Sequence, residues 1–180
     1  MKTKIYFDGD SVTYGKELFD LSKRYSALVC EKLNAEEHNI ALNGGSNRRV
    51  MRNLIDNLGK FDRYVIQMAK RSRTEWYDED EDKWQIVTNQ PVKSGNYDFW
   101  KRYYREIYHD NYGITDELIC YNFIRALLVN VPHLILWSGD YDFNLPADLV
   151  YKKGSFSVRR GHPNEEGHQM ICDDILNIWR

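Results

Sequence analysis

Short strand-like runs alternate with longer amphipathic segments along the chain. Three apolar runs and one more polar run have the length of strands, and they cover residues 5–7, 63–68, 134–137 and 36–41. Apolar residues recur at helical spacing over residues 21–33, 48–58, 100–108, 115–130 and 165–179. Strands that alternate with helices predict an α/β domain of three layers (α/β/α), with helices on both faces of a central, mostly parallel sheet.

The segment 71–96 follows neither period. Its charge runs and aromatic residues predict a long loop or insertion beside the cleft. Together with the helical pattern that follows, the insertion or cleft-side segment is expected to span residues 71–113. The aromatic residues between Trp76 and Trp100 either form a stacking surface for a sugar or another ring, or pack as ordinary core residues. No internal repeat or flexible linker appears, so residues 1–180 are expected to form one domain.

Composition narrows the class of protein. Of the 180 residues, 42% are hydrophobic and 29% are charged, and the net charge of -2 shows no basic surplus, so nucleic-acid binding is not indicated. No apolar run approaches the roughly 20 residues of a membrane helix, and the first residues lack the apolar stretch of a signal peptide. We therefore expect a cytoplasmic protein that does not bind membranes.

The three cysteines, Cys30, Cys120 and Cys172, are far apart in the sequence, and each lies in a helical apolar pattern. This arrangement predicts buried free thiols rather than disulfides. No metal-ligand spacing appears, and we expect neither a metal nor a cofactor.

Two positions near opposite ends of the chain could carry chemistry. Ser11 follows the first strand in Gly9-Asp10-Ser11, where backbone N–H groups around its hydroxyl would favour developing negative charge. The tripeptide alone is more typical of a simple turn. His162 directly precedes Pro163, which can begin the last helix, and that helix could bring the histidine over the first strand as a base for Ser11. His168, about one turn further on, is expected to be structural.

Three blocks in this order resemble the conserved blocks of the SGNH (GDSL-like) hydrolases. They are residues 7–15 (Phe-Asp-Gly-Asp-Ser-Val-Thr-Tyr-Gly), 39–47 (Asn-Ile-Ala-Leu-Asn-Gly-Gly-Ser-Asn) and 162–168 (His-Pro-Asn-Glu-Glu-Gly-His). The glycine-rich Ser-Asn loop and Arg73-Thr74-Glu75 are most similar to small phage-encoded members. The resemblance spans nearly the whole chain. If the protein is encoded by a phage, the expected location is the cytoplasm of the host cell.

The resemblance implies a flavodoxin-like SGNH-hydrolase fold and a set of roles. Ser11 would be the nucleophile and His162 the general base. Asp10 would lie beside the site, and the oxyanion would be bound by the Ser11 N–H, the Gly44 N–H and a side-chain amide.

The sequence departs from the family pattern after the third strand. Residues 67–70 are Gln-Met-Ala-Lys, where the family typically has Gly-x-Asn-Asp, so the usual donor asparagine is missing. Either Asn47 supplies the missing amide or Arg73 stabilises the oxyanion. Because losing one donor typically costs about 10²–10³ in turnover, the replacement matters.

A second departure lies just before His162. The family usually has an aspartate two or three residues earlier, but here these positions are Arg160 and Arg159. Two cations would disfavour the imidazolium that forms during acylation. The alternatives are a serine-histidine dyad held by a backbone carbonyl and a relocated acid, Asp140 or Asp142.

Two functions follow from these observations. The first is a hydrolase that deacylates a small ester or an acetylated sugar through an acyl-enzyme on Ser11. The second is a catalytically impaired protein on the same scaffold that binds an anionic, nucleotide or sugar ligand. In the second case the cleft would be lined by Arg71, Arg73, Arg159 and Arg160.

Overall fold

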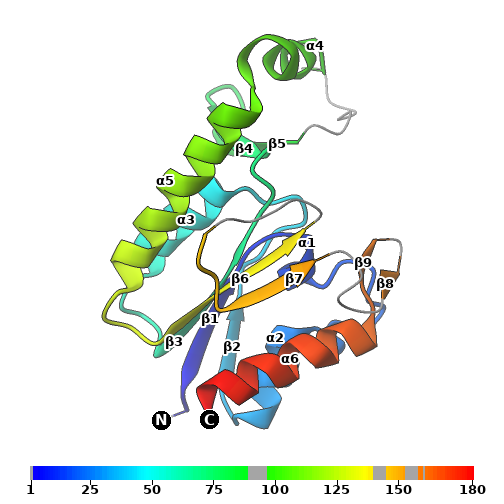
Figure 1. The fold of residues 1–180 in the computed structure, drawn as a ribbon, viewed down its shortest axis with the longest axis vertical. Coiled ribbons are helices and arrows are strands. Elements are labelled where there is room, and N and C mark those ends of the chain that lie inside the picture. Colours follow the sequence, from blue (N-terminus) through cyan, green and yellow to red (C-terminus); the bar gives the residue numbers. More distant parts are fainter. Residues whose placement is uncertain (1, 89–96, 140–144, 153–157, 160) are drawn as a thin grey trace.

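A parallel sheet of five strands forms the centre of the computed structural model, which describes residues 2–88, 97–139, 145–152, 158–159 and 161–180 (Figure 1). The strands are β1 (Lys4–Asp8), β2 (Glu36–Asn39), β3 (Arg63–Met68), β6 (His133–Gly139) and β7 (Leu149–Lys152). Their order across the sheet is β2-β1-β3-β6-β7, and every neighbouring pair is parallel. This is the flavodoxin-like strand order, as the resemblance implied.

Helices cover both faces of the sheet. One face carries α2 (Tyr25–Lys32) and α6 (Glu165–Trp179), and the other carries α3 (Asn47–Asn57) and α5 (Asp110–Leu128) (Figure 1). The structure thus confirms the predicted three-layer α/β/α architecture. None of the helices in the described ranges has the length and apolar character needed to cross a bilayer.

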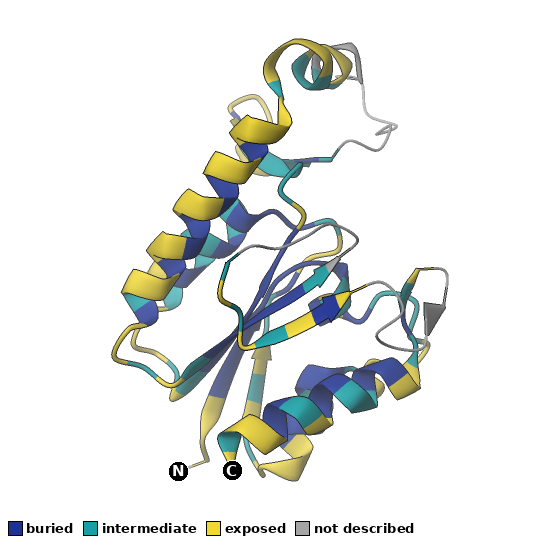
Figure 2. Ribbon diagram, viewed as in Figure 1, coloured by how far each residue is buried: buried dark blue, intermediate teal, exposed yellow. Residues whose placement is uncertain are grey.

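The core consists of two apolar clusters separated by the sheet. Along β1, Ile5 and Phe7 pack under α2 and α6, whereas Tyr6 packs under α3 and α5. Successive side chains of a strand point to opposite faces, so a sheet covered on both sides needs apolar residues at every position. Figure 2 shows the resulting continuous burial along the central strands. The three cysteines are buried and free, as predicted.

The segment after residue 71 was predicted to be a long loop or an insertion, and the loop alternative is wrong for residues 74–87. These residues form an antiparallel hairpin of β4 (Thr74–Asp78) and β5 (Lys83–Val87), which pairs with no strand of the central sheet. Because polar residues occur on both of its faces, among them Gln85 on one and Glu75 on the other, neither face gives the fully apolar period of a half-buried strand. Before α5, the chain forms the short helix α4 (Tyr97–Arg102) and one π-helical turn.

The strand order places a topological switch point at the carboxyl end of β1. The chain leaves β1 for β2 on one side, and the next strand, β3, lies on the other side of β1. Loops diverge at such a point and leave a crevice in which ligands of α/β proteins bind. Residues 9–11 and the end of β3 meet there.

His168 is buried where α6 packs on α2. Its Nδ1 accepts the Tyr25 backbone N–H at 3.2 Å, and the two rings stack with centroids 6.0 Å apart. Burial, together with smaller contributions from the charges of Arg24 and His162, lowers the pKa of His168 to about 4. The residue is structural, as the sequence predicted.

We expect this histidine to destabilise the fold in acid. The unfolded chain binds a proton near pH 6.5, whereas the native chain does not until about pH 4, so stability is lost as pH falls between these values. The free energy of unfolding should fall by roughly 3 kcal/mol between pH 7 and pH 4 from this group. Urea unfolding of wild type, His168→Gln and the control His38→Gln measures it. Equal pH slopes for wild type and His168→Gln would contradict the prediction.

Candidate active site

The turn after β1 is organised by side chains that accept its backbone N–H groups. Asp10 caps the short helix α1 (Ser11–Tyr14), and its Oδ1 accepts the Val12 N–H at 3.0 Å. Gln67 Oε1 accepts the N–H groups of Thr13 at 3.1 Å and Asp10 at 3.3 Å. In the part of the chain that the structure describes, the Ser11 N–H has no acceptor. It is therefore the one N–H at the start of this helix that remains available to a ligand.

Gln67 was not identified as a site residue from the sequence. It was noted only as a departure from the Gly-x-Asn-Asp block that SGNH hydrolases typically have at residues 67–70. Its side chain, in a residue only 1% exposed, also accepts the Thr13 hydroxyl at 2.7 Å and donates from Nε2 to Asp10 Oδ1 at 2.8 Å. A signal was present, because Gln67 interrupts the apolar run of β3 near its carboxyl end. A lone amide in a buried strand needs hydrogen-bond partners, and here the partners lie in the turn that carries Ser11.

Gly9 allows Gln67 to approach this turn. A Cβ on Gly9 would lie 2.7 Å from Gln67 Cβ and 2.8 Å from Thr13 Oγ1, too close for any side chain. The glycine of the Gly-Asp-Ser motif is thus explained by close packing against β3.

Ser11 and His162 face each other at the switch point. His162 Nε2 lies 3.1 Å from Ser11 Oγ, although 151 positions separate the two residues in the sequence. The histidine lies in β9 (His162–Pro163), which pairs with β8 (Val158–Arg159). Asn164 then caps α6 by accepting the Gly167 N–H at 3.0 Å. A nucleophile and a base at this distance are the minimum for general-base activation of a hydroxyl.

Arg73 reaches the same site from the other side. Its Nη1 lies 2.6 Å from Asp10 Oδ2 and 3.4 Å from the Gly45 carbonyl oxygen. Its Nε and Nη2 make no hydrogen bond to any residue that the structure describes. The guanidinium therefore lies between the Ser11 turn and the glycine loop, with N–H donors to spare.

The glycine loop lies directly against the turn. A Cβ on Gly45 would be 2.8 Å from the Gly9 carbonyl oxygen. The Gly45 N–H closes a turn onto Leu42 O at 2.7 Å, whereas the Gly44 N–H has no acceptor among the described residues. Gly44 has a φ of +84°, a conformation that favours glycine. The two N–H donors expected for an oxyanion, those of Ser11 and Gly44, are thus both uncommitted.

Asn47 is engaged elsewhere. Its Oδ1 accepts the Ala69 N–H at 2.6 Å, and its Nδ2 donates to the Ala69 carbonyl oxygen at 3.1 Å. This paired contact ties the start of α3 to the chain after β3. Of the two replacements considered for the missing asparagine, Arg73 has the more uncommitted donors.

A buried ion pair between Asp8 and Arg49 lies at the end of β1, directly before the turn that carries Ser11. Asp8 is fully buried, and it accepts hydrogen bonds from Arg49 Nη1 at 2.7 Å and Asn53 Nδ2 at 3.0 Å. Burial raises the pKa of the Asp8 carboxyl, and the Arg49 guanidinium opposes that change. Sequence reasoning did not single out this pair, because residues 41 positions apart give no local signal.

The acid expected behind His162 stays a prediction. Asp140, Asp142 and Arg160 lie outside the described residues, and of Arg159 only the backbone in β8 is described.

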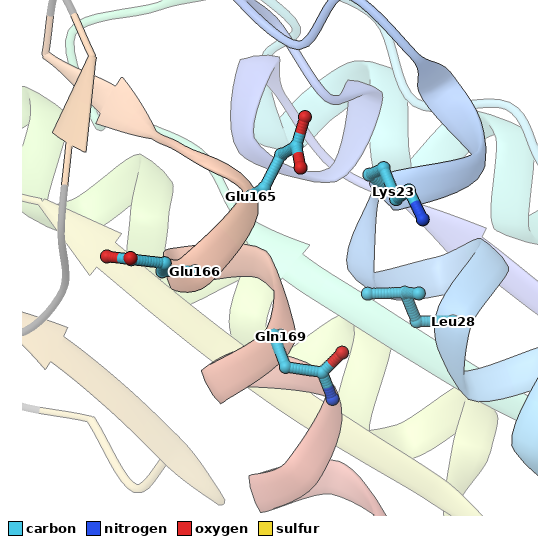
Figure 3. Close-up of a pocket in the computed structure, with 5 residues that line it drawn as sticks. All are labelled: Lys23, Leu28, Glu165, Glu166 and Gln169. Atoms are coloured by element: carbon cyan, nitrogen blue, oxygen red, sulfur yellow. The ribbon is translucent and has the colours of Figure 1, made fainter.

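A separate depression of about 270 Å³ lies between the start of α6 and the segment leading into α2 (Figure 3). Lys23, Leu28, Glu165, Glu166 and Gln169 line it, and Glu166 points away from Lys23. None of these residues belongs to the Ser11 turn or the glycine loop. The depression is therefore not the candidate active site.

No protein-family model matches this sequence, and no curated protein matches it. Solved structures do match over almost the whole chain. The acetyl xylan esterase AlAXEase has a TM-score of 0.58 at 14% identity, covering 97% of this chain and 98% of that one. A carbohydrate esterase family 2 enzyme with its carbohydrate binding domain, from Corynascus thermopiles, has a TM-score of 0.58 at 14% identity; the match covers 99% of this chain but only 65% of that one.

A protein assigned to the G-D-S-L family of lipolytic proteins, from Desulfitobacterium hafniense DCB-2, has a TM-score of 0.52 at 14% identity, covering 98% of this chain and 99% of that one. Similarity at this level of identity establishes the fold and leaves the chemistry to the site itself. The chain has the α/β fold shared by these carbohydrate esterases and the G-D-S-L protein.

Proposed function

We propose that this chain is a serine hydrolase of the SGNH type, which removes an acyl group from an ester through an acyl-enzyme on Ser11. The observation that carries the proposal is the 3.1 Å contact between His162 Nε2 and Ser11 Oγ at the switch point of the sheet. The esterase fold of the neighbouring structures supports it.

The reaction follows from the positions of these groups. Ser11 Oγ attacks the ester carbonyl carbon while its proton passes to His162 Nε2, and a tetrahedral oxyanion forms. The C–O bond to the alcohol then breaks, and the alcohol leaves with the proton from His162. A water molecule activated by the same nitrogen attacks the acyl-enzyme, releases the carboxylic acid and returns the proton to Ser11 Oγ.

The oxyanion would be held by the Ser11 N–H, the Gly44 N–H and Arg73. Asp10 holds Nη1 of the arginine, which leaves Nε and Nη2 for the developing charge. A cationic donor held in place before reaction stabilises an oxyanion without reorganisation. In this scheme Arg73 takes the place of the asparagine that the sequence lacks.

The substrate class is a small ester or an acetylated sugar. The similar solved structures include two acetyl xylan esterases, AlAXEase and the enzyme from Butyrivibrio proteoclasticus, which favours the sugar. Kinship with small phage-encoded SGNH proteins and a cytoplasmic location belong to the same proposal and rest on sequence alone.

A non-catalytic anion binder is less well supported. Of the four arginines expected to line the cleft, the two whose side chains the structure describes each have a carboxylate partner, in the pairs Arg71–Glu117 and Arg73–Asp10. Pairing of this kind neutralises much of the positive charge that an anionic ligand would need.

Labelling with a fluorophosphonate probe tests the hydrolase directly. We expect wild type and the exposed-serine control Ser22→Ala to be labelled, and Ser11→Ala to remain unlabelled, because among the described serines only Ser11 lies within hydrogen-bonding distance of a histidine. Release of acetate from 4-nitrophenyl acetate should follow the same pattern. Labelling that persists in Ser11→Ala, or wild type inert to the probe, to 4-nitrophenyl acetate and to acetylated xylan, would refute the proposal.

A further inference from the structure

Two exposed aromatic rings lie side by side on the β4–β5 hairpin. Tyr77 and Trp84 are direct cross-strand partners, so both side chains are on one face of the hairpin. Their ring centroids are 5.5 Å apart with planes inclined by 66°. Tyr77 is 41% exposed and Trp84 is 45% exposed, so neither is a core residue. Of the two readings of this aromatic segment, the stacking surface fits this pair and core packing does not.

The tryptophan is held from the adjacent helix. The Arg52 guanidinium, from α3, lies 4.6 Å from the centroid of the Trp84 ring. The same guanidinium donates from Nε and Nη2 to Glu75 at 3.0 and 2.9 Å, and the Glu75 side chain is only 4% exposed. A bidentate pair to a buried carboxylate fixes the arginine, and the arginine fixes the ring. The ring is therefore ordered before any ligand arrives, which reduces the entropy cost of binding.

The surroundings of the pair are polar. The hairpin turn carries Glu81 and Asp82, and Lys83 begins β5. The Tyr77 hydroxyl donates a hydrogen bond to Asp82, and Lys83 forms an ion pair with Glu81. Nη1 of Arg52 makes no hydrogen bond to a described residue. An isolated pair of rings with charged and hydrogen-bonding neighbours does not resemble the broad apolar patch of a protein interface. It suits a ligand with one apolar face and a polar edge, which is the character of a sugar ring.

The hairpin is joined to the candidate active site at both ends. Strand β4 begins at Thr74, directly after Arg73. Strand β5 ends at Val87, and the next residue places its Cγ2 3.8 Å from where a Cβ on Gly44 would lie. A chain of linked sugars bound at Ser11 therefore has a fixed aromatic surface on an adjoining element.

We propose that Trp84, Tyr77 and Arg52 form a subsite that binds a sugar ring of an oligomeric substrate, away from the reacting ester. The inference rests on the proposed esterase function, and it adds that the substrate is a neutral glycan several sugars long. Trp84 and Tyr77 contact the C–H face of one ring, and Arg52 Nη1 donates to its hydroxyl groups.

The test separates binding from catalysis. Trp84→Ala should lower kcat/KM about tenfold on acetylated xylan oligosaccharides, which corresponds to roughly 1.4 kcal/mol of lost ring contact. The same variant should leave kcat/KM on 4-nitrophenyl acetate within twofold of wild type, because that ester carries no sugar ring for the hairpin to bind. Tyr112→Ala, which removes an equally exposed ring from α5, should change neither value.

Titration of the Ser11→Ala variant with xylohexaose, by calorimetry, gives a readout that does not depend on turnover. Binding should be detected, and adding Trp84→Ala or Tyr77→Ala should weaken it by a similar factor of about ten. Binding without esterase activity in wild type would refute the catalytic proposal and leave the subsite standing. Three results would overturn the subsite. They are equal losses of kcat/KM on both substrates, the absence of oligosaccharide binding, and Trp84-dependent binding of a nucleotide such as AMP in place of the oligosaccharide.

Discussion

Replacing Arg73 by methionine is expected to lower kcat for an acetyl ester by about 10²–10³-fold while changing KM little. The reason is that Arg73 lies between Asp10 and Gly45 and has uncommitted donors where the family's asparagine is absent. A donor that acts on the oxyanion contributes in the transition state and not in the ground state, so the loss appears in kcat. Steady-state kinetics with 4-nitrophenyl acetate measures this effect.

A structural role for Arg73 must be separated from a catalytic one. Removing the arginine leaves the Asp10 carboxylate, 6% exposed, without its cation, and this is itself destabilising. The double variant Arg73→Met with Asp10→Asn removes both charges and keeps an oxygen to cap α1. We expect the double variant to recover most of the stability in urea unfolding and none of the lost kcat. Recovery of kcat together with stability would show that Arg73 only neutralises Asp10.

Ser11 and His162 could be paired from the sequence because the order of the motifs along the chain indicates the order of strands and helices in the fold. The block with Ser11 follows a strand, and the block with His162 precedes the last helix of an alternating α/β pattern. Parallel strands have their carboxyl ends at one edge of the sheet, so both blocks are expected at that edge. The distance between Nε2 and Oγ then confirms that the two residues meet. The β3 strand and the α6 helix were predicted with the bounds that the structure shows, because β3 is a nearly continuous apolar run and α6 has apolar residues at helical spacing.

The residues that sequence reasoning missed act through long-range polar contacts. Gln67 contacts Thr13 across 54 positions, and Arg49 contacts Asp8 across 41. Such contacts leave no periodic trace, because one polar residue in a strand changes the pattern very little. The hairpin was missed for a related reason. Its order comes from the Arg52–Glu75 pair and from aromatic contacts, and not from burial of one apolar face.

The strongest test of how the Ser11 turn is positioned is at Gln67. Gln67→Met removes the acceptor for two backbone N–H groups and leaves these groups buried, at a cost of about 1–3 kcal/mol for each. We expect the free energy of unfolding to fall by a few kcal/mol on this account. We also expect kcat to fall about 10²-fold, because the freed turn no longer holds the Ser11 hydroxyl and N–H in place.

Gln67→Glu shows whether Gln67 positions the turn or only stabilises it. When protonated, the introduced carboxyl has the shape of the amide: its C=O accepts the Thr13 N–H and its O–H donates to Asp10. When ionised, it places a second negative charge against Asp10, which also raises its own pKa. The ratio of variant to wild-type kcat should therefore rise as pH falls from 8 to 5. Gln85→Glu places a charge beside Asp78 and Glu81 on the hairpin, and its ratio should stay flat. A flat ratio for Gln67→Glu, with stability reduced, would mean that Gln67 holds the fold together and has no part in positioning Ser11.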